Sequence, residues 1–117
     1  MKSKTLNKVT LEKGERKIAS TVGNYIKKNT SKGKEVTNAG LVSMLESNGF
    51  KKVQDSEIRK VIHWLRVKGK FQWILANKKG YFYSESEQDL KIYISTLKKK
   101  INSMREVARS FSYFDKE

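Results

Sequence analysis

The sequence predicts a mainly α-helical domain with a small β-hairpin, followed by a long amphipathic C-terminal helix. Three observations support this fold class. Segments of the N-terminal half repeat apolar residues at helical spacing. Two short aromatic runs then flank a turn that ends in glycine, which is typical of a hairpin. The last third of the chain keeps an apolar heptad pattern that neither proline nor glycine interrupts.

The first helix is expected over residues 15–28. Its apolar stripe consists of Ile18, Val22, Tyr25 and Ile26. Residues 29–34 are loop formers and should end it. Residues 1–14 are lysine-rich with weak periodicity, so we expect a flexible basic arm there. An arm lying along phosphates and an unstructured end both fit that composition.

The ends of the next two helices are marked by capping residues. A short strand at 35–36 should precede Thr37, which suits an N-cap, and Gly49 should close the second helix. Asp55 is expected to cap the third helix and Gly69 to end it. The face of the third helix that should be buried consists of Ile58, Val61, Ile62 and Leu65.

The predicted hairpin pairs residues 71–76 with 81–83 through a loop at 77–80. Ser84 and Glu87 match a capping box at the start of the long helix. The stripe of this helix consists of Leu90, Ile94, Leu97, Ile101, Met104, Ala108 and Phe111. The expected organisation is therefore an arm at 1–14, a domain at 15–84, a long helix at 85–114 and a tail at 115–117.

The charge balance predicts a polyanionic partner. The chain has 26 Lys and Arg against 12 Asp and Glu, which gives a formal net charge of +14. Such a charge attracts nucleic acid, although a lysine-rich composition can also serve solubility alone. No apolar run is long enough to span a membrane, and the N-terminus does not resemble a secretory signal. The chain contains no cysteine, which fits the cytoplasm, the expected location.

Three helices followed by a hairpin is the layout of a winged helix-turn-helix domain, whose third helix enters the DNA major groove. With Ile58 placed at the centre of the buried face, the outward face carries Ser56, Arg59, Lys60 and His63. Arg can read guanine, and Ser and His can donate to or accept from bases. A solvated charged face is the alternative, but no acid follows Glu57 on this helix, whereas idle surfaces normally mix charge signs.

Further cations surround this face. Arg66 lies at its flank, where phosphate contact is expected. Lys78 and Lys79 sit at the predicted hairpin tip, where clamping of phosphate and ordinary turn chemistry are equally compatible with the sequence. Aromatic residues interleaved with lysine leave RNA or single strands as alternatives. The expected nucleic-acid-binding residues are Ser56, Arg59, Lys60, His63, Arg66, Lys78 and Lys79.

The sequence offers no catalytic or metal-binding pattern. It contains one histidine, no cysteine, no phosphate-binding glycine loop and no paired carboxylates in register. We therefore expect neither an enzyme nor a metal or other cofactor.

The run from Asp55 to Gly69 is similar to the third-helix segment of small bacteriophage winged-helix proteins, with their pattern x-[VI]-R-x-x-[IV]-x-x-L-R-x-x-G. Lys79-Gly80-Tyr81, the acidic start at 85–90 and the basic helix at 97–108 match the hairpin and the long helix of that group. The resemblance covers roughly residues 15 to 112. It implies DNA binding in a phage or mobile element, in gene control, replication or genome handling. The link at 49–54 is longer than the usual turn of about 3–4 residues.

The long helix should pair two copies of the chain. The residues expected to form that contact are Ile101, Met104, Ala108 and Phe111. Folding of the helix onto its own domain is the alternative. Cations off the stripe would weaken a coiled coil unless acids or nucleic acid offset them. The sequence thus predicts a homodimeric protein that binds double-stranded DNA, and the alternative function is a protein-interaction adaptor for an acidic partner.

Overall fold

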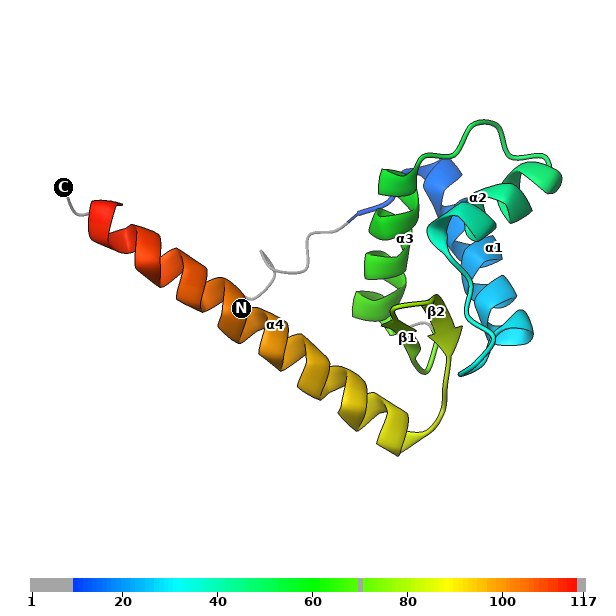
Figure 1. Ribbon diagram of the computed structural model, residues 1–117. Helices are drawn as coiled ribbons and strands as arrows, with labels where there is room; N and C mark the ends of the chain where they lie inside the picture. Colours follow the sequence, from blue (N-terminus) through cyan, green and yellow to red (C-terminus); the bar gives the residue numbers. More distant parts are fainter. Residues whose placement is uncertain (1–9, 70, 116–117) are drawn as a thin grey trace. The chain divides into compact units, whose positions relative to one another are not determined.

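The computed structural model describes residues 10–69 and 71–115 (Figure 1). The chain divides into two compact units, one up to Glu85 and one from Ser86 onward. In the described residues the first unit contains three helices and a two-stranded antiparallel hairpin, and the second is a single long helix. The predicted class, mainly helical with a small hairpin, is confirmed.

The three helices of the first unit are α1 (Lys13–Asn29), α2 (Asn38–Ser47) and α3 (Asp55–Lys68). They form a small bundle in which α3 packs against both α1 and α2. The apolar face expected for α3 is fully buried, and so are most of the stripe positions of α1. The largest buried side chains are Ile26, Leu41, Leu45, Ile58, Ile62, Leu65, Val22 and Val61. This core fixes which face of α3 is left for other contacts.

The ends of α2 and α3 follow the predicted capping chemistry with one correction. The Thr37 side chain accepts the Gly40 N–H at 3.0 Å, as an N-cap should. Gly69 ends α3 with a φ of 66°, in the left-handed region that glycine adopts without strain. The expectation that Asp55 caps α3 is wrong, because Gln54 is the N-cap and forms a reciprocal capping box with Glu57. Asp55 lies in the first turn instead.

The expectation of a flexible arm through residue 14 is wrong for residues 11–14. Leu11 is buried, with 6% of its surface exposed, and belongs to the core. Glu12 is the N-cap of α1, which begins at Lys13. The burial of this single apolar side chain extends the folded domain toward the N-terminus, ahead of α1. Residues 1–9, the rest of the predicted arm, lie outside the described residues.

The hairpin consists of β1 (Ile74–Asn77) and β2 (Gly80–Tyr83), with Ile74 opposite Tyr83. It begins later than predicted, because Phe71 packs against the helical core instead of pairing. Gly80 has a φ of 136°, and a Cβ there would lie 2.3 Å from the Val36 carbonyl oxygen. Only glycine therefore permits this close approach between the hairpin and the loop before α2.

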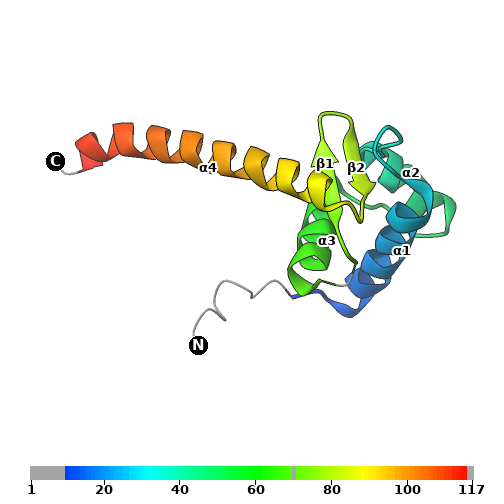
Figure 2. The same ribbon diagram turned by 90° about the horizontal axis from the view of Figure 1, so that it is seen from below.

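The hairpin is attached to the helical bundle by backbone hydrogen bonds. Val36 and Tyr81 exchange two N–H···O=C bonds, of 2.9 and 2.8 Å. The short strand predicted at 35–36 is thus a single bridge residue. The Thr30 hydroxyl donates to the Ile26 carbonyl at 2.6 Å and accepts the Tyr83 N–H at 2.9 Å, which ties the end of α1 to β2. In both views the hairpin lies beside the end of α3 (Figures 1 and 2).

The second unit is α4 (Glu87–Asp115). The predicted capping box of Ser84 with Glu87 is wrong, since Ser86 occupies the capping position and its hydroxyl accepts the Asp89 N–H at 3.2 Å. Ser84 is instead buried in the first unit, where its N–H donates to the Trp73 carbonyl. Along α4, large apolar side chains are exposed: Ile92, Ile94, Leu97, Ile101, Met104, Val107 and Phe111. In the described part of the chain no helix is both long and apolar enough to cross a membrane.

Candidate nucleic-acid interface

The exposed face of α3 carries Ser56, Arg59 and His63. Their spacing of three and four residues places them on one side of the helix. The burial of Ile58, Ile62 and their neighbours on the opposite side fixes this orientation. The structure thus brings together three of the residues that the sequence singled out, one hydrogen-bonding side chain in each successive turn.

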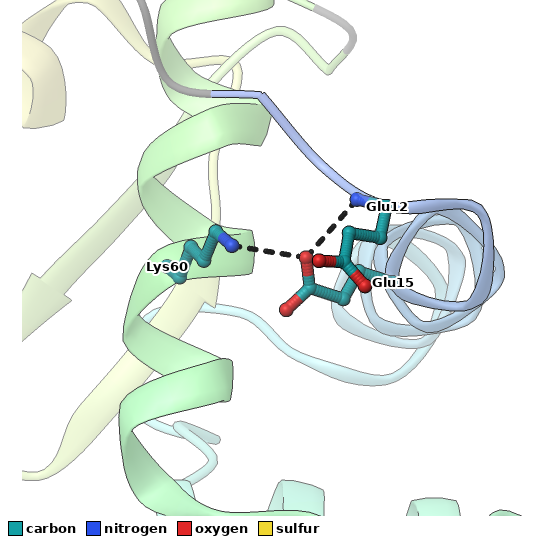
Figure 3. Close-up of polar contacts among 3 residues, drawn as sticks. All are labelled: Glu12, Glu15 and Lys60. Atoms are coloured by element: carbon teal, nitrogen blue, oxygen red, sulfur yellow. Dashed lines mark hydrogen bonds and ion pairs between the residues drawn. The ribbon is translucent and has the colours of Figure 1, made fainter.

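Lys60 is engaged with α1 (Figure 3). Its ammonium nitrogen lies 3.0 Å from the Glu15 carboxylate oxygen Oε1, and the same oxygen accepts the Glu12 N–H at 3.1 Å. The Glu12 N–H, and then Lys60, hold the pKa of the Glu15 carboxyl below its usual value. Lys60 remains exposed, but a contact with phosphate would compete with this ion pair.

Arg66 fastens the hairpin to the last turn of α3. Its Nε donates to the Ile74 carbonyl at 2.8 Å, and its guanidinium carbon lies 5.9 Å from the centroid of the Tyr81 ring. That separation is within the range of a cation–π contact. The sequence predicted Arg66 as a phosphate contact at the flank of the helix. In the structure it also sets the position of β1 relative to α3.

Lys78 and Lys79 form the two-residue turn of the hairpin, and both are exposed. Asn77 holds the turn in shape, since its Oδ1 accepts the Lys79 N–H at 2.8 Å. The Asn77 Nδ2 donates to Glu35 at 2.8 Å, and Glu35 also accepts the Gly33 N–H at 2.9 Å. These hydrogen bonds, that from Asn77 first, lower the pKa of the Glu35 carboxyl. The hydrogen bonds of Asn77 therefore hold the turn in shape, while the side chains of Lys78 and Lys79 face solvent.

A shallow hollow of about 260 Å³ lies between the hairpin tip and the first turn of α2. It is lined by Thr37, Asn38, Ala76, Asn77, Lys78, Lys79, Gly80 and Tyr81. Backbone N–H groups at a helix N-terminus favour anions, and two lysine ammonium groups add to that preference. The sequence pattern gave no sign that α2 takes part here. It marked Thr37 only as an N-cap, and an N-cap does not predict which residues some forty positions later will lie beside it.

A larger hollow of about 600 Å³ lies between α1 and α3, on another side of α3 from Arg59 and His63. Its lining combines aromatic, polar and basic side chains: Thr10, Leu11, Arg16, Ser20, Asn24, Trp64, Leu65, Lys68 and Phe71. Trp64 and Lys68 lie on a different side of α3 from Arg59 and His63. This hollow is therefore separate from the surface that carries Arg59 and His63.

The residues predicted for pairing, Ile101, Met104, Ala108 and Phe111, all lie exposed on α4. Among the described residues there is no group of three or more His, Asp or Glu side chains that could hold a metal ion. No protein-family model, curated protein or solved structure matches the chain.

Proposed function

We propose that the chain binds double-stranded DNA as a winged helix-turn-helix protein, with α3 in the major groove and the hairpin against the flanking backbone. The observation that carries the proposal is the outward face of α3, where Ser56, Arg59 and His63 are exposed in successive turns. The helix carries no acidic residue beyond Glu57, so after its first turn no side chain of α3 would repel phosphate. The net charge of +14 supports the same class of partner.

The arrangement of the hairpin supports the proposed fold type. The hairpin follows α3 in the chain, Arg66 holds it beside that helix, and the Val36 bridge joins it to the loop before α2. A protein that reads DNA in this way needs both elements to meet one duplex, one in the groove and one on the backbone. Attachment of the hairpin to α3 and to the loop before α2 keeps the distance between α3 and the hairpin fixed.

The residues divide by role in this proposal. Arg59 forks to a guanine edge, and His63 and Ser56 contact neighbouring bases. Lys78 and Lys79, together with the first turn of α2, hold phosphate. Lys60 and Arg66, each of which has a protein partner, chiefly position α3 and the hairpin and contribute charge to the interface.

Selection from random duplexes, followed by titration of the selected site and a scrambled site, tests the proposal. Arg59→Ala should weaken binding to the selected site by about 1–3 kcal/mol and should relax sequence preference, because base-edge contacts are lost. His63→Ala should act in the same direction. Lys17→Ala is the matched control, since it removes one cation from an exposed position of α1.

Three outcomes would oppose the proposal. A chain that shows no preference for any duplex, or an Arg59→Ala variant with unchanged preference, would remove α3 as the reading element. Duplex DNA that fails to compete for the chain at low salt would favour the alternative, an adaptor for an acidic protein.

A further inference from the structure

The apolar stripe of α4 follows a heptad register, in which the first and fourth positions, a and d, form the seam of a coiled coil. The a positions are Ile94, Ile101 and Ala108, and the d positions are Leu90, Leu97, Met104 and Phe111. Most of these side chains are exposed, from 37% for Leu97 to 68% for Met104. A single 29-residue helix cannot bury its own apolar stripe. The seam can be removed from water only by packing against another apolar surface.

We propose that α4 pairs with α4 of a second copy as a parallel, in-register, two-stranded coiled coil. The residues along the seam indicate the number of strands. Among parallel coiled coils, β-branched isoleucine at a combined with leucine at d favours two strands, and that combination occupies the first half of the seam. Ala108 at the third a position allows the two helices to approach closely.

The charges that flank the seam support the parallel direction. These flanking positions, e and g, carry the cations Lys91, Lys98, Lys100 and Arg105. In a parallel pair, g of one helix faces the following e of the other, so only Lys100 and Arg105 oppose each other as like charges. Tyr93 faces Lys98, and Ser86 faces Lys91. In an antiparallel pair, e faces e and g faces g. In the antiparallel register that sets Ile101 opposite Leu97, Lys98 and Lys100 each face their own copies, and Lys91 faces Arg105. The parallel pair has less repulsion than this antiparallel register.

Pairing through α4 does not require DNA binding. Beyond the proposed function, it fixes the number of chains in the assembly and the direction of their pairing. Each domain precedes its α4 in the chain, so a parallel pair joins both domains to the same end of the coiled coil.

The first experiment is sedimentation equilibrium of the full chain with two matched substitutions. Ile101 lies at a and is 46% exposed, whereas Ile92 lies at f, opposite the seam, and is 49% exposed. Ile101→Asp buries a charge in the seam and should raise the dissociation constant of the dimer roughly a hundredfold or more. Ile92→Asp, the same change outside the seam, should leave the dimer intact.

Several results would overturn the pairing. A wild-type chain that sediments as a monomer would mean that the stripe is covered by its own domain or by another protein. A trimer or tetramer would reject two strands. Equal effects of Ile101→Asp and Ile92→Asp would mean that the heptad seam is not the contact surface.

Charge reversal tests the direction of the helices. Lys100→Glu or Arg105→Glu alone should tighten a parallel dimer roughly tenfold, because each converts two symmetric like-charge contacts into ion pairs. The double variant should return to the wild-type dissociation constant, since both partners are then acidic. Lys99→Glu is the control, because it makes the same charge change at an f position.

In an antiparallel dimer, Lys100→Glu would replace one like-charge pair by another and would match the Lys99→Glu control. That result would overturn the parallel arrangement, even if the chain is a dimer.

Discussion

Lys60 and Arg66 connect α3 to its neighbours, whereas Arg59 and His63 on the same helix face outward. Helical periodicity separated the buried residues from the exposed ones correctly. It could not tell an exposed cation that binds a neighbouring helix from one that faces solvent, because Glu15 and Lys60 lie 45 residues apart in the chain. At the residue scale, the partner of a long charged side chain depends on how the helices pack.

Glu15 should contribute to stability in a pH-dependent manner. Its folded-state pKa is lowered, so its stabilising effect is present above the usual value of 4.5 and is lost as the pH falls through the folded value. Glu15→Gln keeps an oxygen that can accept the Glu12 N–H but removes the charge that faces Lys60. We expect a loss of at most about 1 kcal/mol at neutral pH, because Lys60 is largely solvated.

Urea unfolding of the wild type and the variant at several pH values measures this contribution. The difference between them should shrink toward zero below the usual carboxyl pKa. Glu46→Gln, which removes an exposed carboxylate of α2, is the control variant. If the difference in unfolding free energy between the wild type and Glu15→Gln stays constant with pH, the charge of Glu15 does not contribute to stability.

The hairpin is the element whose placement depends on the most diverse contacts. The Val36 bridge, the Thr30 hydroxyl and the Arg66 guanidinium reach it from three separate segments. A two-stranded hairpin is only marginally stable in water by itself, so these attachments contribute to its formation as well as to its position.

Replacement of Thr30 should loosen the hairpin. Thr30→Val keeps the shape of the side chain but leaves the Tyr83 N–H without the acceptor that it has in the structure. We expect a loss of about 1–3 kcal/mol in unfolding free energy. Amide hydrogen exchange should also become faster at Tyr83. Thr30→Ser retains the hydroxyl and should preserve slow exchange at Tyr83. Equal exchange rates in the two variants would show that the hydroxyl does not hold β2 in place.

At the element level, helices were easier to predict than their connections. The stripes of α1 and α3 and the glycine that ends α3 follow from local spacing and local conformation. The N-caps of α3 and α4 were misplaced because several polar residues precede each helix and any of them can accept the free N–H groups. The start of β1 was misplaced because Phe71 has strand propensity, but the core offers it a better contact. The hollow at the hairpin tip depends on tertiary packing alone.

The whole molecule combines a strong positive charge with one compact domain and one amphipathic helix. A charge of +14 on 117 residues makes binding to a polyanion sensitive to salt. The affinity for duplex DNA should fall by about 0.9 log units per log unit of salt for each phosphate neutralised.

Measurement of this slope tests the role of the hairpin tip. Lys78→Ala combined with Lys79→Ala should reduce the slope by up to about 1.8, and affinity should fall alike for all sequences. Arg59→Ala should instead change the ratio between selected and scrambled sites. A double hairpin variant with an unchanged slope would place the phosphate contacts elsewhere on the chain.

The Val36 bridge has one more consequence. Because Val36 and Tyr81 exchange two hydrogen bonds at a point where glycine permits close approach, the angle between hairpin and bundle is set before any ligand arrives. A preorganised surface loses little conformational entropy on association, so more of the contact energy appears as affinity. Val36, which does not line the hollow at the hairpin tip, would thus influence how tightly the proposed DNA ligand is held.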